Sequence, residues 1–419
     1  MRPSRLAPAL ALLAAVQLVS ACDRPEPAQS EITAAKPDAL SARLDAAIDK
    51  AIEENRIVGS VVLVAQDGKI VYRRAAGLAD REKSVPMRED AIFRLASVSK
   101  PFVSVAAMRL VEDGTLALDA PITRWLPDFR PRLPDGTAPD ITVRQLLSHT
   151  SGLSYRFIEP QDSAYIRLNV LDGMEQPDTD LAGNLKRLAQ TPLAFKPGTS
   201  FHYSLATDVL GAVIEKATGQ PLQDAVQRLV TAPLGIADTG FAVTDLARLV
   251  PPYLNGEEGP ARMTDDTIMP MGDGRLEFDP SRALNAQAYP SGGAGMVGTA
   301  GDVLTLLEAV RTGGNGLLKP ETVAQMITDQ TGPEARTQGP GWGFGLGWAL
   351  LLDPAAANTP QSKGTFQWGG VYGHSWFVDP EKKLTVVALT NTTPEGMGGP
   401  FVTEVRDAVY GAAAGKTQP

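Results

Sequence analysis

Residues 93–102 read FRLASVSKPF and contain the one Ser-x-x-Lys of the chain, from Ser97 to Lys100. Apolar residues recur at helical spacing over 102–112 and stop at Asp113-Gly114, which predicts a helix that starts at the serine. Three residues along a helix make about one turn, so the Ser97 hydroxyl and the Lys100 ammonium share a face. A helix N-terminus carries unpaired N–H groups, and these would stabilise a developing anion beside Ser97.

The residues around Lys100 are apolar, and burial lowers the pKa of a lysine. A bare Ser-x-x-Lys also arises by chance, as a capping serine followed by a solvated lysine. The apolar surroundings favour a catalytic pair over that alternative.

Strand signals lie at both ends of the chain. Residues 59–65 and 70–72 are β-rich runs joined by an Asp-Gly turn, which predicts a hairpin. Amphipathic helices are expected at 39–57 and at about 401–410. Further strands are expected at 345–351, 365–368, 375–378 and 384–389.

The middle of the chain differs in composition, with many Pro, Gly and Asp residues and short helical patterns. We therefore expect an α+β fold with a central antiparallel sheet flanked by N- and C-terminal helices. Residues 39–124 and 291–413 would build the sheet domain together, and residues 125–290 would form a mostly helical inserted domain.

Six segments, including the one quoted first, carry a family resemblance. They are FRLASVSKPF, TVRQLLSHTSGL (142–153), PLAFKPGTSFHYSLATDVLG (192–211), PSGGAGMVGTAGDVL (290–304), and WGFGLGW with WGGVYGHSWFVDP between 342 and 380. The chain resembles the serine β-lactamase-related family of class C β-lactamase-like and penicillin-binding-protein-like hydrolases, and is most similar to its family VIII carboxylesterases. The resemblance implies a β-lactamase/transpeptidase-like fold.

The resemblance also implies roles for individual residues. Ser97 matches the acylated nucleophile, Lys100 the adjacent base or proton relay, and Tyr203 the tyrosine of the second motif. The backbone N–H groups of Ser97 and Val371 would form the oxyanion hole. The residues expected to contact substrate are Trp368, Gly369, Gly370 and His374.

Lysine and tyrosine titrate near about 10.4 and 10, so neither is a useful base at neutral pH without a change of environment. A tyrosine beside an ammonium favours its phenolate, whereas a desolvated lysine favours its neutral amine, and the pair titrates as one unit. Either Lys100 or Tyr203 is therefore a candidate to accept the serine proton.

Two departures from the penicillin-recognising pattern bear on the substrate. Leu205 stands where that pattern has the asparagine of Tyr-x-Asn, and Trp368-Gly369-Gly370 stands where it has Lys-Thr-Gly. A β-lactam or D-alanyl peptide carries a carboxylate that the missing lysine would bind. Both changes favour a small neutral ester. Trp368 with the insertion is expected to narrow the cleft, so short acyl chains should be preferred.

Several alternatives remain. β-Lactamase, D-alanyl carboxypeptidase, D-amino-acid amidase and acyltransferase activities would use the same three residues, and a non-catalytic cell-envelope binding protein would keep the fold alone. A Ser-His-Asp hydrolase would need a base among His149, His202 and His374, but no Gly-x-Ser-x-Gly elbow occurs.

The chemistry calls for no cofactor, and the scattered histidines lack the spacing of a metal site. The formal charge of −9, without a basic stripe, argues against nucleic acid as a partner. No sequence feature specifies an oligomeric state.

The first residues have the layout of an export signal. Arg2 and Arg5 precede an apolar run, and Cys22 is the single cysteine of the chain. Val19-Ser20-Ala21-Cys22 resembles the lipobox of bacterial lipoproteins, which predicts a signal peptide at 1–21 and a lipidated, flexible tether at 22–38. We expect the protein on the periplasmic side of a bacterial membrane; cleavage by an ordinary signal peptidase, giving a soluble periplasmic or secreted protein, is the alternative.

Overall fold

An antiparallel sheet of eight strands forms the centre of the structure, a computed structural model that describes residues 39–332 and 335–411. Its strand order is β10-β11-β12-β13-β14-β1-β2-β3. The strands are β1 (Gly59–Gln66), β2 (Lys69–Asp80), β3 (Val85–Pro86), β10 (Trp342–Phe344), β11 (Ala349–Leu351), β12 (Phe366–Gly370), β13 (His374–Asp379) and β14 (Leu384–Thr390).

The two ends of the chain meet in the middle of this sheet. Strand β1 pairs antiparallel with β14, with Ser60 opposite Thr390, and with β2 on its other side. Every residue of β1 except Gln66 is buried, which explains its continuous hydrophobic run. The expected α+β fold with a central antiparallel sheet is confirmed.

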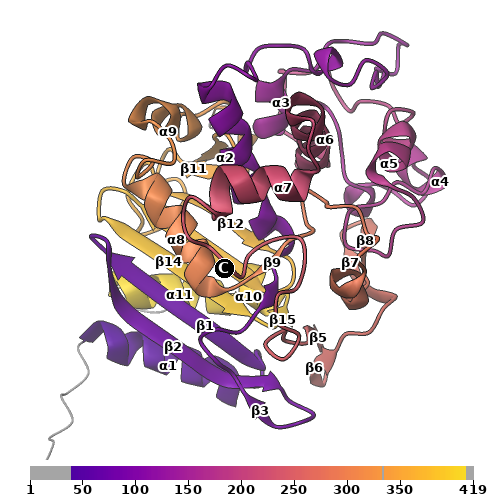
Figure 1. The fold of residues 1–419 in the computed structure, drawn as a ribbon. Helices are drawn as coiled ribbons and strands as arrows, with labels where there is room; N and C mark the ends of the chain where they lie inside the picture. Colours follow the sequence, from indigo (N-terminus) through magenta and orange to yellow (C-terminus); the bar gives the residue numbers. More distant parts are fainter. Residues whose placement is uncertain (1–38, 333–334, 412–419) are drawn as a thin grey trace, which may run out of the picture. The chain divides into compact units, whose positions relative to one another are not determined.

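Helices cover both faces of the sheet (Figure 1). Helices α1 (Ala39–Glu53) and α11 (Pro400–Tyr410) pack together on one face, where Leu44 and Phe401 are fully buried. Helices α2 (Ser99–Glu112) and α8 (Ala300–Arg311) pack on the other face. The sheet is therefore the middle layer of three.

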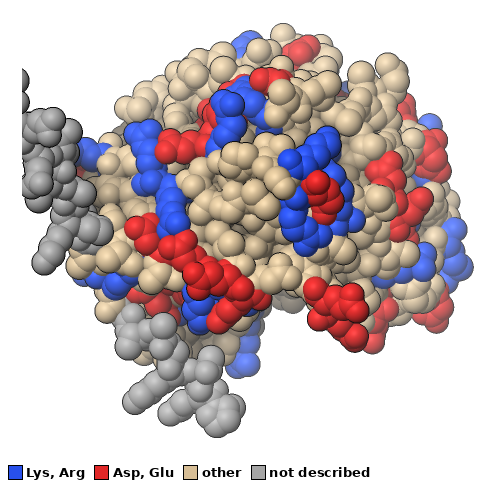
Figure 2. All heavy atoms as spheres, turned by 90° about the horizontal axis from the view of Figure 1, so that it is seen from below, with Lys and Arg blue, Asp and Glu red and all other residues tan. Residues whose placement is uncertain are grey.

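Ion pairs tie α11 to the first helix and the residues that follow it. Glu404 binds Arg56 at 2.7 Å and Lys50 at 2.8 Å. Viewed from below, acidic side chains form a diagonal run with basic side chains beside it, and a second acidic cluster lies on the same face (Figure 2). In the described part of the chain, no helix is long and apolar enough to cross a membrane.

The segment from 125 to 290 contains more strand than the sequence suggested. Its helices are short: α3 (Val143–Leu147), α4 (Ala164–Arg167), α5 (Leu181–Leu188), α6 (Ala206–Thr218) and α7 (Leu222–Val226), the last continued by a π-helical turn at Gln227–Thr231. Two hairpins follow them: β5 (Tyr253–Gly256) with β6 (Gly259–Arg262), and β7 (Thr267–Met271) with β8 (Gly274–Phe278).

These hairpins were missed because each strand has only four or five residues. In β7, Ile268 is exposed and Met269 is buried, which is an alternation too short to stand out in the sequence. The described residues from Ala39 onward form one compact unit, so the proposed division into two domains stays a prediction. The signal peptide, Cys22 and the tether lie outside the described residues.

The expected strand at 345–351 is interrupted. The chain makes β10, turns through Gly345–Trp348 and returns as β11. Gly347 has a φ of 120°, and a side-chain carbon there would lie 2.6 Å from the Ser104 hydroxyl of α2. Only glycine allows the chain to pass this close to the helix.

Smaller elements complete the fold. Strand β4 (Phe93–Arg94) pairs with β9 (Val297–Gly298), and β15 (Thr392–Thr393) pairs with β5. The remaining helices are α9 (Pro320–Met326) and α10 (Glu395–Gly398), with 3-10 turns at Ala96–Val98, Ile122–Arg124, Arg156–Ile158 and Pro280–Leu284.

Candidate active site

Ser97 lies in a 3-10 turn between β4 and α2, two residues before the helix begins. The turn is fixed on its N-terminal side, because the N–H of Leu95 donates to the carbonyl of Met296 at 2.9 Å. Ala96 has a φ of 45°, a left-handed conformation that is unfavourable for a residue with a side chain. The surrounding contacts therefore hold a strained backbone immediately before the serine.

Lys100 lies in the first turn of α2 and is 1% exposed. Its Nζ donates to the carbonyl of Gly293 at 2.9 Å and to Oγ of Ser97 at 3.2 Å. The same ammonium lies 4.6 Å from the ring centre of Tyr203 and 5.3 Å from that of Tyr155. Two hydrogen bonds and two aromatic faces thus compensate a buried charge.

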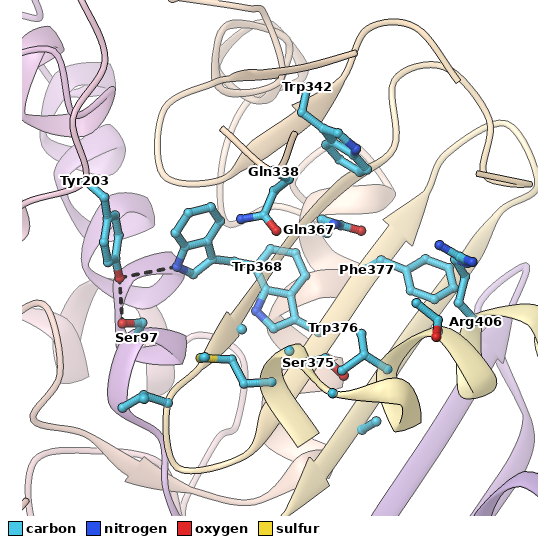
Figure 3. A pocket seen from close by; sticks show the side chains of 18 of the residues that line it. Ser97, Tyr203, Gln338, Trp342, Gln367, Trp368, Ser375, Trp376, Phe377 and Arg406 are labelled. Atoms are coloured by element: carbon cyan, nitrogen blue, oxygen red, sulfur yellow. Dashed lines mark hydrogen bonds between the residues drawn. The ribbon is translucent and has the colours of Figure 1, made fainter. Parts of the chain in front are cut away.

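Tyr203 comes from the loop that precedes α6, and its Oη donates to Oγ of Ser97 at 2.6 Å. Nε1 of Trp368 on β12 donates to the same phenolic oxygen at 3.4 Å. Figure 3 shows Ser97, Tyr203 and Trp368 side by side at one end of the cavity. The structure therefore brings together all three residues of the predicted catalytic set: Ser97, Lys100 and Tyr203.

Two histidines, buried His149 and half-buried His202, support the loop that carries Tyr203. The N–H of Ser204 donates to Nδ1 of His149 at 3.3 Å, and His202 shares a hydrogen bond of 2.9 Å with the Ser154 hydroxyl. Burial holds the pKa of His149 well below its usual value, with the charge of Lys100 adding to the effect. In the described residues no histidine hydrogen-bonds Ser97, so a Ser-His pair is not formed.

The end of β12 packs against the turn that carries Ser97. A side-chain carbon at Gly370 would overlap the carbonyl oxygen of Leu95, so a glycine is required for this approach. Ser97 and Val371 both line the same cavity. This arrangement is compatible with the predicted oxyanion hole, which stays a prediction.

The expected substrate contacts divide into two groups. Trp368 and Gly369 line the cavity, whereas Gly370 and His374 lie outside its wall. His374 is 1% exposed, and its Nε2 donates to the carbonyl of Arg94 at 2.8 Å. Its placement in the cleft was wrong, because β13 turns this side chain toward β4 and away from the cavity.

The cavity has a volume of about 790 Å³ and is lined mainly by apolar and aromatic side chains. One wall comes from the segment 125–290, which supplies Tyr155, Phe157, Met174 and Leu276. The cavity continues past Trp368 along the sheet to Arg406 on α11 (Figure 3). It is larger than the narrow cleft that the sequence suggested.

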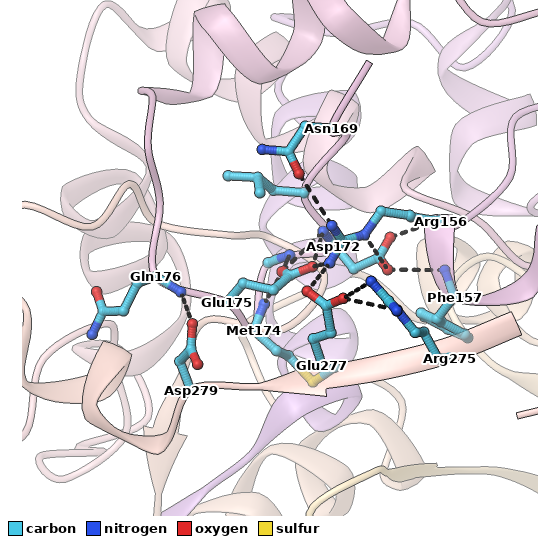
Figure 4. A network of polar contacts seen from close by, with 12 residues as sticks. Arg156, Phe157, Asn169, Asp172, Met174, Glu175, Gln176, Arg275, Glu277 and Asp279 are labelled. Carbon is cyan, nitrogen blue, oxygen red and sulfur yellow. Dashed lines mark hydrogen bonds and ion pairs between the residues drawn. The ribbon is translucent and has the colours of Figure 1, made fainter. Parts of the chain in front are cut away.

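A buried polar network holds the wall that contains Phe157 and Met174 (Figure 4). Arg156 binds Glu175 at 2.6 Å and Glu277 at 2.8 Å, which joins the wall to the β7–β8 hairpin. Asp172 accepts hydrogen bonds from the N–H groups of Arg156 and Phe157. Burial and the neighbouring Glu175 raise the pKa of the Asp172 carboxyl well above its ordinary value.

Three residues at the site were not identified from the sequence: Tyr155, Asp208 and Gly293. Tyr155 follows the LLSHTSGL segment by two residues, and Asp208 and Gly293 lie inside other quoted segments. Asp208 and Gly293 were therefore inside quoted motifs and Tyr155 was just beyond one, but only the packing places them beside Lys100. In the described residues, no group of three or more His, Cys, Asp or Glu side chains could hold a metal ion.

An antiparallel sheet between helical layers, with a serine, a lysine and a tyrosine in contact at a helix N-terminus, defines a serine hydrolase of the β-lactamase fold. A sequence model of the β-lactamase family matches residues 44–409, and the chain belongs to that family.

Individual relatives narrow the comparison. The chain is 56% identical to esterase EstB of Burkholderia gladioli over 88% of this chain and 95% of that protein. It is 30% identical to a lovastatin esterase of Penicillium rubens, over 81% and 90% of the two chains. A solved structure described as EstCE1, a hydrolase with promiscuous acyltransferase activity, is 51% identical with a TM-score of 0.87 and covers 89% of this chain and 98% of its own.

Buried His374 should make stability depend on pH. Burial lowers its pKa to about 4, whereas an unfolded histidine titrates near about 6.5. Between these values the unfolded chain binds a proton that the folded chain does not, so stability falls as the pH falls from about 6.5 to 4. His374→Gln, whose amide can still donate to Arg94, should reduce that slope by about 1.4 kcal/mol per pH unit.

Urea unfolding of both proteins across this pH range measures the effect. Equal slopes for the parent and His374→Gln would show that His374 is not neutral in the folded state.

Proposed function

We propose that the protein is a carboxylesterase that hydrolyses small ester substrates through an acyl-enzyme on Ser97. The observation that carries the proposal is the double contact on one oxygen: Oγ of Ser97 hydrogen-bonds both Nζ of Lys100 and Oη of Tyr203. The serine is partly exposed to the cavity, so a substrate can reach it.

The reaction begins when Oγ of Ser97 attacks the ester carbonyl carbon and the Lys100–Tyr203 pair takes the hydroxyl proton. The resulting oxyanion would lie between the N–H groups of Ser97 and Val371. The pair then returns the proton to the departing alcohol oxygen, leaving the acyl group on Ser97. Water attacks the acyl-enzyme by the same route and releases the acid.

Two positions favour an ester over a β-lactam. Trp368 presents an indole where the penicillin-recognising pattern has a lysine, so no cation is available there for a substrate carboxylate. Leu205, where that pattern has asparagine, is fully buried in the core and offers the site no amide. The esterase names of the relatives at 56% and 30% identity support the same choice.

The size of the cavity widens the range of esters that we propose. A volume of about 790 Å³ is within the range of sites for drug-sized ligands. The space in the cavity therefore does not by itself impose a preference for short acyl chains. We propose that apolar acyl groups bind against the wall formed by Phe157, Met174 and Leu276.

Ser97→Ala should abolish hydrolysis of p-nitrophenyl esters, with a loss of about a thousandfold or more in kcat, because the nucleophile is removed. Tyr203→Phe keeps the ring and removes the contact on Ser97, and its kcat should fall by about a hundredfold or more.

Nitrocefin turnover, measured in parallel, should be negligible in the parent protein. Efficient nitrocefin hydrolysis with weak ester hydrolysis would favour the β-lactamase alternative, and failure of a fluorophosphonate to label Ser97 would favour a binding protein.

Acyl transfer to alcohols is a second candidate activity. The rings of Tyr155 and Trp368 lie 5.1 Å from the ring of Tyr203 and so surround the serine with aromatic surface. An acyl-enzyme shielded from water has more time to react with a bound alcohol. A relative at 51% identity is described as having promiscuous acyltransferase activity, which supports this proposal.

Trp368→Ala should therefore lower the ratio of transfer to hydrolysis several-fold, because it opens the serine to water. The ratio is measured as new ester over free acid in the presence of a short primary alcohol. Trp342→Ala, which removes an indole from β10 in the same cavity, is the matched control and should change the ratio less. An unchanged ratio in Trp368→Ala would contradict a shielding role.

We further propose that the protein is exported and is held at the periplasmic side of a bacterial membrane by a lipid on Cys22. The support is the layout of residues 1–22 in the sequence. The full-length chain expressed in a Gram-negative host should incorporate labelled palmitate and sediment with membranes, whereas Cys22→Ser should do neither. A soluble, unlabelled parent protein would favour the ordinary signal-peptidase alternative.

A further inference from the structure

We propose that Asp208, a buried carboxylate behind Lys100, is a positioning residue that holds Lys100 beside Ser97 and favours the protonated form of the Lys100–Tyr203 pair. The inference rests on the proposed esterase function and deepens it. Asp208 belongs to none of the predicted catalytic or substrate-binding positions.

Asp208 lies in the first turn of α6, five residues after Tyr203, and is 1% exposed. Its Oδ1 accepts the hydroxyl of Ser291 at 2.6 Å. Its Oδ2 is buried and makes no close hydrogen bond among the described residues, and the N–H of Gly293 is the backbone group that faces the carboxylate. A buried carboxylate oxygen without a close hydrogen bond is unfavourable, so a nearby positive charge is needed to compensate it.

Lys100 supplies that charge across a single glycine. A side-chain carbon built on Gly293 would lie 2.5 Å from Oδ2 of Asp208, 3.4 Å from Nζ of Lys100 and 2.9 Å from Oη of Tyr155. Polar atoms of Asp208, Lys100 and Tyr155, which come from three separate segments, therefore surround the position that a side chain at Gly293 would occupy. The absence of a side chain at Gly293 lets the carboxylate and the ammonium approach each other.

The glycine-rich loop at 290–296 also links the two groups mechanically. Ser291 binds Asp208 and accepts the N–H of Ala294 at 3.1 Å, while the carbonyl of Gly293 accepts Lys100 at 2.9 Å. Asp208 thus fixes the loop whose carbonyl fixes Lys100. This gives a function to a loop that contains no group able to act on substrate by itself.

Other charged and titratable groups also face this cluster. Around Asp208 they are Lys100, Arg282, Tyr155 and Tyr289, and around Lys100 they also include His149 and Tyr203. Arg282 donates its hydrogen bonds to the backbone carbonyls of Glu175 and Tyr289, and these bonds do not involve Asp208. Burial raises the pKa of Asp208, and the Ser291 hydrogen bond followed by the charge of Lys100 opposes that rise.

The sign of the effect on catalysis follows from Coulomb's law. A negative charge stabilises a nearby protonated base, so a proton that must leave before Ser97 can react should leave at lower pH once the Asp208 charge is removed. The acidic limb of the pH profile of kcat/KM reports this proton. Asp208→Asn removes the charge with almost no change of volume and keeps an oxygen for Ser291.

We expect Asp208→Asn to lower kcat and to move the acidic limb of kcat/KM for a p-nitrophenyl ester down by about one pH unit. The matched control is Asp379→Asn on β13, which also removes a fully buried carboxylate, one that is bound by Tyr410 and the N–H of Ser362. Asp379→Asn should leave the acidic limb of the kcat/KM profile at the same pH. A lower rate with an unmoved limb in Asp208→Asn would overturn the proposal and leave Asp208 a structural residue.

Ser291→Ala tests the proposal if Asp208→Asn does not fold. It keeps the charge and releases Oδ1, so kcat should fall while the limb moves less than one pH unit; an unchanged kcat would overturn the positioning role. Esterase activity and fluorophosphonate labelling of the parent protein distinguish a failure of the proposed esterase function from a failure of the proposed role of Asp208. An inactive, unlabelled parent refutes the proposed function, whereas an active parent with an unmoved limb refutes only the role of Asp208.

Discussion

Lys100 places an ammonium group in the protein interior, and a buried charge is stable only when polar groups compensate it. The compensation comes from the Gly293 carbonyl, the Ser97 hydroxyl and the faces of Tyr155 and Tyr203. These groups belong to four separate parts of the chain. Satisfying one charge therefore requires the helix, the glycine-rich loop and the two tyrosine-bearing segments to meet at one point.

The sheet makes this meeting possible. Because β1 and β14 pair in its centre, strands from both chain ends form one rigid platform, and β12 reaches the turn that carries Ser97. Glycines occur at two close contacts, where Gly370 meets the backbone of Leu95 and Gly347 meets the Ser104 side chain of α2. The reactive turn is thus held between a strand end and a buried helix, which sustains the left-handed Ala96 beside the nucleophile.

The segment between the two halves of the sheet shapes what the site can bind. Its hairpins and the network around Arg156 build an apolar wall opposite the sheet, and Trp368 places an indole beside Tyr203 at the serine. Such a site suits uncharged acyl and alcohol groups more than a carboxylate-bearing ring.

The sequence by itself determined the sheet-forming ends, the terminal helices and the Ser97–Lys100 pair, because local periodicity and one helical turn specify those features. Resemblance added Tyr203, which lies 106 residues from Ser97 and whose approach no local pattern encodes. Only the tertiary structure decided that His374 faces away from the cavity, that two short hairpins form part of the segment 125–290, and that Asp208 and Tyr155 lie beside Lys100. The reason is physical: secondary structure depends on neighbours in the chain, whereas the burial and the partner of a side chain depend on which distant surfaces pack together.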